Sequence, residues 1–214
     1  MTTTILMNAL LFDGLSDELK QDAYVVVEKG LIKEVGNGIP HFAAARIVDV
    51  GGRVLMPGLI DAHVHLIATD ANLAKLSTDP IMLTSHRAGR IAEEMLMRGF
   101  TSVRDAGGAD FGFSLAVTEG LIKGPRIYYS GRVISQTGGH GDMRPLVQDS
   151  QFCTCCIPAA EFTIIADGVD EVRKAARTEL KRGASQIKIM GSGGVASPTD
   201  PIWNLQYSEE EIRA

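Results

Sequence analysis

From Leu59 onward, strand-like runs alternate with helical patterns, and this alternation limits the possible folds more strongly than any other feature of the sequence. The strand-like runs lie at 59–65, 101–105, 126–130 and 186–190. The helical patterns between them lie at 79–98, 110–122 and 167–182. Strands that alternate with helices are typical of βαβ units, so we predict an α/β region with a parallel sheet.

The first fifty residues show no helical period and predict a small β module. Their strand-like runs lie at 3–11, 23–28, 31–35 and 46–50. Lys29 and Gly30 separate the second run from the third, which is a signal for a two-residue hairpin. We therefore expect a β module over residues 1–56 and an α/β region over residues 57–214.

The charge and the apolar pattern exclude several classes of protein. The chain has 21 Lys and Arg against 26 Asp and Glu, a net charge of −5 with no basic block, which argues against a nucleic-acid partner. Its apolar stretches are far too short to span a membrane, and the start lacks the pattern of a secretory signal. Cys153, Cys155 and Cys156 cluster in one segment and provide no disulfide framework, so we expect a reduced, cytoplasmic protein with these thiols in a loop.

The last residues predict that another helix begins there. Ser208 and Glu211 have the spacing of a capping box, in which Ser is the N-cap and Glu is the third helical residue. The chain ends at Ala214, after four βα units of which the last is incomplete. A (β/α)₈ barrel needs eight strands and about 250 residues. We therefore expect the first half of such a barrel, truncated after its fourth unit.

His63 and His65 are the most informative chemical signal. The strand period of two places Asp61, His63 and His65 on one face, while Ala62 and Val64 point the other way. Two imidazoles at the end of a strand can share one metal ion, with Zn–N distances of about 2.0–2.1 Å. The alternative is a pair of half-exposed histidines on an edge strand.

Lys188 lies in the fourth predicted strand, on the face opposite Ile187 and Ile189. A lysine that points into a barrel is costly unless it is neutral, paired or modified. A lysine in a strand is more often simply solvated, but the position of Lys188 in the fourth unit, together with the two histidines on the first strand, favours a functional role. At the end of the second strand, we expect Arg104 and Asp105 to form an ion pair that stabilises the mouth of the barrel; the alternative is a direct role in substrate binding.

Four segments together resemble the amidohydrolase superfamily. They are Met56-Pro-Gly-Leu-Ile-Asp-Ala-His-Val-His65, Gly99-Phe-Thr-Ser-Val-Arg-Asp105, Gly139-His-Gly141 and Lys188. The chain looks most similar to the branch of prolidase-like and carboxypeptidase-like dipeptide hydrolases, which are relatives of imidazolonepropionase. The resemblance implies a (β/α)₈ barrel beside a small β-sandwich, of which residues 1–56 would be the N-terminal part.

The resemblance also implies two divalent metal ions, usually zinc. His63 and His65 would hold one of them, and Lys188, carboxylated on its amine, would bridge the two. The remaining ligands and the aspartate that acts as general base are expected beyond Ala214. His140, in a glycine-rich loop after the third strand, would contact the substrate through a carboxylate or the scissile carbonyl; the alternative is a histidine in a flexible surface loop.

The predicted function is hydrolysis of a C–N bond, in a peptide or an N-acyl amino acid, by a metal-activated water. A metal pair about 3.5–4 Å apart lowers the pKa of a bridging water and polarises a carbonyl. Alternatives are a cyclic-amide (imidazolonepropionase-like) hydrolase, an esterase or phosphotriesterase, and a scaffold or fragment without activity. We expect a small-molecule substrate, a homo-oligomeric full-length protein, and no activity from these 214 residues alone.

Overall fold

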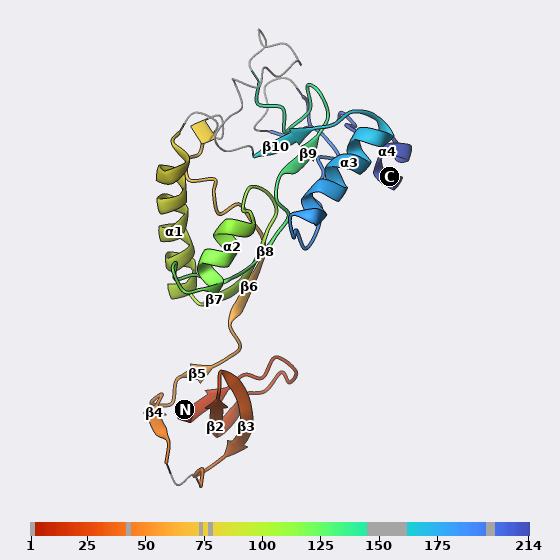
Figure 1. Ribbon diagram of the computed structural model, residues 1–214. Helices are drawn as coiled ribbons and strands as arrows, with labels where there is room; N and C mark the ends of the chain where they lie inside the picture. Colours follow the sequence, from red (N-terminus) through yellow and green to blue (C-terminus); the bar gives the residue numbers. More distant parts are fainter. Residues whose placement is uncertain (1–2, 42–43, 73–74, 77–78, 145–161, 196–199) are drawn as a thin grey trace. The chain divides into compact units, whose positions relative to one another are not determined.

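The computed structural model describes all residues except 1–2, 42–43, 73–74, 77–78, 145–161 and 196–199. The chain divides into two compact units, Met1–Gly58 and Leu59–Ala214 (Figure 1). The cysteines of residues 153–156, which we expected in a loop, lie outside the described residues.

The N-terminal unit is a mixed sheet of five strands in which β1 is central. The strands are β1 (Thr4–Leu11), β2 (Lys20–Glu28), β3 (Leu31–Asn37), β4 (Arg46–Asp49) and β5 (Val54–Leu55). The order is β3-β2-β1-β4, and β5 also pairs with β1. β2 runs antiparallel to β1 and β3, whereas β4 and β5 run parallel to β1. The four strands expected from the sequence are present, and β5 is a short addition.

The turn between β2 and β3 confirms the predicted hairpin. Lys29 and Gly30 have φ values of 54° and 79°, and both residues of a type I′ turn require positive φ. Beyond the turn, β3 exposes large apolar side chains, among them Leu31 at 73% and Ile32 at 69%. The described residues of this unit form one sheet.

The second unit begins with three parallel strands in the order β6-β7-β8. They are β6 (Leu59–Val64), β7 (Phe100–Asp105) and β8 (Arg126–Tyr129). Helices α1 (Ile81–Met97) and α2 (Phe111–Thr118) connect them and pack against the sheet (Figure 1). The shared core contains Ala88, Ala92 and Met95 of α1, Phe113 of α2, Val103 of β7, and Ile127 and Tyr129 of β8. The predicted α/β architecture with parallel strands is therefore confirmed.

After β8 the chain turns at Gly131, which has a φ of 72°, into β9 (Val133–Ser135). β9 pairs in parallel with β10 (Thr163–Ile165), a short strand that the sequence analysis missed. On its other side Ile134 forms a single parallel bridge to Ile189. The predicted strand at 186–190 is thus reduced to one bridge, because only Ile134 exchanges backbone hydrogen bonds with this segment among the described residues.

Helix α3 (Gly168–Lys181) packs on β9 and on the short helix α4 (Glu209–Arg213). Its buried face consists of Val172, Ala175 and Glu179, whereas Leu180 is 52% exposed. The Asp167 side chain, at the N-cap position of α3, does not cap the helix, because its carboxylate accepts hydrogen bonds from the amide and hydroxyl of Thr137.

The capping box at the start of α4 is present as predicted. The Ser208 hydroxyl accepts from the amide of Glu211, and the Glu211 carboxylate accepts from the amide of Ser208. The other oxygen of this carboxylate accepts from the amide of Gly168, the first residue of α3. Glu211 therefore joins the N-terminal ends of two helices.

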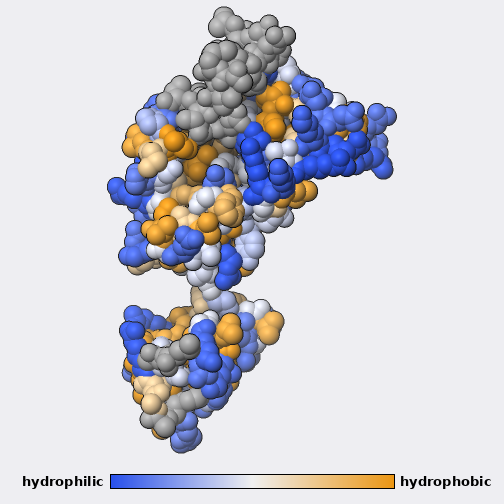
Figure 2. Space-filling model, viewed as in Figure 1, coloured by the Kyte–Doolittle hydropathy of each residue, from blue (hydrophilic) through white to orange (hydrophobic). Residues whose placement is uncertain are grey.

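Figure 2 shows apolar patches scattered between charged surface on both units. Ile60 on β6, an edge of the β6-β7-β8 sheet, is 72% exposed. No described helix combines the length and the apolar character needed to cross a membrane.

Candidate metal centre

The C-terminal end of β6, which carries His63, contains a β-bulge. The pairing of β6 with β7 shifts by one residue between Asp61 and Val64, so Ala62 and His63 together lie opposite Arg104. Two side chains satisfy the backbone of the bulge: Arg104 Nε donates to the Ala62 carbonyl at 2.6 Å, and Asp61 accepts from the His63 amide at 3.1 Å. Bulges near functional sites redirect side chains, and this one sets the direction of His63.

The rings of His63 and His65 lie together, as the sequence predicts. Their centroids are 5.3 Å apart and their planes meet at 70°. His65 Nδ1 lies 3.1 Å from the carbonyl oxygen of Gly107. Because a carbonyl can only accept, Nδ1 carries the proton of the neutral ring and Nε2 is left with a free lone pair. The ring of Phe162 also lies near His65, at a centroid distance of 5.5 Å.

Lys188 approaches both histidines closely enough to affect their protonation. Burial lowers the pKa of His63 and of His65, and the positive charge of Lys188 lowers each pKa further. Both imidazoles are therefore neutral at neutral pH, which is the form that binds metals. Ile187 and Ile189 pack in the core with α3, so Lys188 lies on the opposite face of its segment, as predicted.

Asp105 does not form the expected ion pair with Arg104. Successive residues of a strand point to opposite faces, and here Arg104 is exposed whereas Asp105 is fully buried. The Asp105 carboxylate accepts three backbone hydrogen bonds, from Leu66 at 2.7 Å, Gly107 at 3.0 Å and Ala109 at 3.2 Å. Burial raises its pKa from 3.8 to about 6, against the opposite effect of these donors. The sequence signal for this role is an Asp directly before Ala-Gly-Gly at a strand end.

His140 is held in a separate cluster in which three loops meet. Its amide donates to Gln206 Oε1 at 3.0 Å, and its Nδ1 lies 3.4 Å from Asp200 Oδ2 without hydrogen-bond alignment. Gln206 in turn donates to Asp200, which is only 4% exposed. Asp200 and Gln206 have no local signal in the sequence, because the acid and the amide lie sixty or more residues from His140.

The glycines after Lys188 allow close approach of this cluster. A Cβ on Gly194 would lie 2.1 Å from His140 Cε1, and one on Gly193 would lie 2.1 Å from the carbonyl oxygen of Pro201. In the structure they leave room for His140 and for the segment that carries Asp200.

The donor set at β6 fits a divalent ion. It offers two neutral imidazoles, one of them with its tautomer fixed by a backbone carbonyl, which is a common arrangement around metal-bound histidines. Within the described residues, no group of three or more His, Cys, Asp or Glu side chains converges as a metal site. The described residues therefore do not close a metal site by themselves, and a closed site would need further donors.

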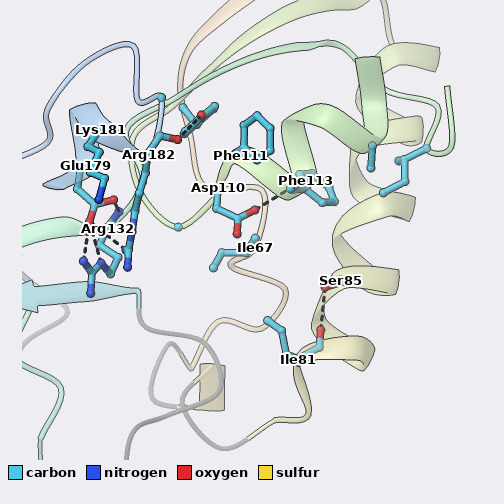
Figure 3. Close-up of a pocket in the computed structure, with 17 residues that line it drawn as sticks. Ile67, Ile81, Ser85, Asp110, Phe111, Phe113, Arg132, Glu179, Lys181 and Arg182 are labelled. Atoms are coloured by element: carbon cyan, nitrogen blue, oxygen red, sulfur yellow. Dashed lines mark hydrogen bonds and ion pairs between the residues drawn. The ribbon is translucent and has the colours of Figure 1, made fainter. Parts of the chain in front are cut away.

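The hollow in Figure 3 is a different feature. It has a volume of about 1320 Å³ and lies beside α1, α2 and the end of α3. Its lining includes Ile67, Phe111, Arg132 and Glu179, but none of His63, His65, His140 and Lys188. The hollow is thus no part of the candidate metal centre.

Comparison with known proteins places these features in a family. A model of the Amidohydrolase family matches residues 54–214. The chain is 36% identical to ochratoxinase from Aspergillus niger over 225 residues, which cover 98% of this chain and 46% of that protein. It is 26% identical to imidazolonepropionase from Methylobacterium sp. (strain 4-46) over 248 residues, 90% of this chain and 61% of that protein.

A solved structure of a prolidase complexed with N-methylphosphonate-L-proline is 48% identical to the chain, with a TM-score of 0.94. The match covers 99% of this chain and 52% of the prolidase chain. The chain therefore spans about half the length of the relatives that it matches. Its parallel strands and covering helices, together with the preceding sheet, correspond to about half of a (β/α)₈ barrel protein.

Proposed function

Because the chain belongs to the amidohydrolase family, we propose that the protein containing it is a metal-dependent hydrolase of a C–N bond in a peptide or an N-acyl amino acid. The expected relationship to prolidases and imidazolonepropionase is confirmed by the similar proteins. Similarity to a prolidase and to ochratoxinase supports a small substrate with an amide bond. The observation that carries the proposal is the pair of neutral imidazoles at the end of β6, with Lys188 beside them.

Each residue has a distinct role in this proposal. His63 and His65 would hold one divalent ion through their free ring nitrogens, and Lys188, carboxylated on its amine, would bridge to a second ion. Bound divalent ions supply an activated water and polarise the scissile carbonyl. Lys188 is half-buried near the two histidines, which is the position that a bridging ligand would need. Zinc is the expected metal.

His140 would bind the substrate. Its backbone is fixed by Gln206, and its ring lies against Gly194 and beside the buried Asp200. An Nε2–H group on this ring can donate a hydrogen bond to an anionic group. A free carboxylate of a peptide or an N-acyl amino acid is such a group.

The decisive experiment combines metal analysis with hydrolysis assays on the complete polypeptide that contains these residues. We expect about two divalent ions per chain and loss of most activity in His63→Ala, with one site emptied. His86→Ala, on the exposed surface of α1, is the matched control and should retain both. Absence of bound metal, with activity that chelators leave unchanged, would refute the proposal.

Lys188 is tested separately. Lys188→Ala should lose the second metal and regain part of its activity with a short carboxylic acid, because the acid can replace the missing bridge. Lys188→Arg should stay inactive. The control Lys174→Ala, at an exposed position of α3, should behave as wild type. Full activity in Lys188→Arg would show that the lysine has only a structural role.

The substrate class is decided by a panel of dipeptides, N-acyl amino acids, cyclic amides and phosphotriesters. Preferential turnover of the first two supports the proposal. Preferential turnover of cyclic amides would favour the alternative suggested by the likeness to imidazolonepropionase.

A further inference from the structure

Asp105 is a buried carboxylate to which the proposed mechanism gives no task. It is fully buried, and no cation forms an ion pair with it among the residues that the structure describes. Burying an ionised group costs several kcal/mol unless hydrogen bonds compensate for the loss of water. Its three compensating donors all belong to loops that begin at the ends of β6 and β7.

The hydrogen bonds of Asp105 hold two backbone groups that adjoin His65. Asp105 Oδ2 accepts from the amide of Leu66, the residue directly after His65. Asp105 Oδ1 accepts from the amide of Gly107, and the carbonyl of the same Gly107 faces His65 Nδ1 at 3.1 Å. One carboxylate therefore fixes the backbone beside His65 and the group that orients its ring.

Gly107 leaves no space for another arrangement. A Cβ at this position would lie 2.4 Å from Val133 Cγ2 and 3.3 Å from His65 Nδ1. Its φ of 152° is also one that other residues rarely adopt. The Gly107 carbonyl thus reaches the ring of His65 only because residue 107 has no side chain and because Asp105 holds its amide.

We propose that Asp105 is a positioning residue, which acts through Leu66 and Gly107 to hold His65 as the Nδ1–H tautomer with Nε2 available to a metal ion. This inference rests on the proposed function, in which a metal ion binds to the free lone pair of Nε2. Asparagine cannot replace Asp105, since its amide nitrogen would place a donor against one of the three backbone N–H groups. In Asp105→Asn we therefore expect Gly107 and Leu66 to shift and the ring of His65 to lose its fixed tautomer.

The first test measures metal affinity on the complete polypeptide. Zn²⁺ is removed, and its rebinding is followed by competition with a chromophoric chelator, well below the unfolding temperature. Asp105→Asn should bind Zn²⁺ about 10- to 100-fold more weakly than wild type, the usual effect of losing a group that orients a ligand. The visible spectrum of the Co²⁺-loaded protein should change in parallel.

Glu179→Gln is the matched control, because Glu179 is also a buried carboxylate that accepts from backbone and side-chain donors. It should lower the unfolding temperature but leave the affinity of the folded protein for Zn²⁺ unchanged. Equal affinities for wild type and Asp105→Asn would overturn the inference. Failure of wild type to bind Zn²⁺ would instead overturn the proposed function, so the two failures are distinguishable.

The second test needs no variant at position 105. Nitrogen-15 NMR of histidine-labelled metal-free protein, with the His65 signals assigned by comparison with His65→Gln, reports which ring nitrogen carries the proton. We expect Nδ1–H for His65. A predominant Nε2–H form would overturn the inference even if Asp105→Asn failed to fold.

Discussion

Glu179 on α3 forms a buried ion pair whose loss should be costly. It is 2% exposed and accepts from Arg132 Nη2 at 2.7 Å, from Nε at 2.9 Å and from the Arg132 amide at 3.2 Å (Figure 3). Arg132 lies at the turn between β8 and β9, and β9 pairs with the segment that carries Lys188. We predict that Glu179→Ala destabilises this part of the fold.

The expected loss of stability in Glu179→Ala follows from the burial of the Arg132–Glu179 ion pair. The side chains of Arg132 and Glu179 are 14% and 3% exposed, so Glu179→Ala leaves a guanidinium in a poorly solvated place. Removing one partner of a buried pair costs about 3–5 kcal/mol. The other partner of the carboxylate, Arg182, lies 3.3 Å away and is 55% exposed, and such a pair contributes only about 0–1 kcal/mol.

The assay is urea unfolding of the purified full chain, followed by circular dichroism. Glu179→Ala should lower the free energy of unfolding by about 3–5 kcal/mol, and Arg182→Ala, the matched control, by at most about 1 kcal/mol. The double variant Arg132→Met, Glu179→Met should recover most of the loss, because no unpaired charge remains. A residual loss of about 1–3 kcal/mol is expected, because the backbone N–H of Arg132 loses its acceptor on Glu179.

Two results would refute this reasoning. One is a loss below about 1 kcal/mol in Glu179→Ala, which would mean that the pair is solvated. The other is a double variant that is no more stable than Glu179→Ala, since the cost would then come from lost packing and not from the unpaired charge.

Three further predictions concern the loops around the histidines. Gly107→Ala should weaken Zn²⁺ binding and lower the unfolding temperature, because its Cβ would collide with Val133; wild-type values in both measurements would contradict the close packing. Arg104→Ala should cost about 1 kcal/mol in urea unfolding, because the Ala62 carbonyl loses a hydrogen bond, and an unchanged midpoint would argue against that bond. Burial raises the pKa of Asp105 to about 6, so the folded metal-free protein binds this proton more tightly than the unfolded chain does. As the pH rises from about 4 to about 6, wild type should therefore lose about 3 kcal/mol of unfolding free energy relative to Asp105→Asn. A difference that does not depend on pH would contradict the raised pKa.

The order of the elements could be predicted from the sequence because local patterns determine it. Lys29 and Gly30 adopt positive φ as their dipeptide indicates, Ser208 and Glu211 form their capping box, and Gly99 ends α1 with a φ of 97°. These features depend on residues within one turn of each other, which a sequence displays directly.

The face of each strand could be predicted for the same reason. Lys188 lies opposite Ile187 and Ile189, as the strand period of two indicates. The rings of His63 and His65 also lie together, although the β-bulge at Ala62 and His63 interrupts that period. The composition of the candidate metal centre was therefore available from the sequence and its resemblance to a known family.

Only the tertiary structure decided which partner each polar group takes. Asp167 binds Thr137 instead of capping α3, and Asp105 binds backbone amides instead of Arg104. In each case the chosen partner lies on a different element or loop, and its distance depends on how the strands register and where the chain bends. Neither the bulge at Ala62 nor the single bridge at Ile189 has a local signal, because each depends on the pairing of separate strands.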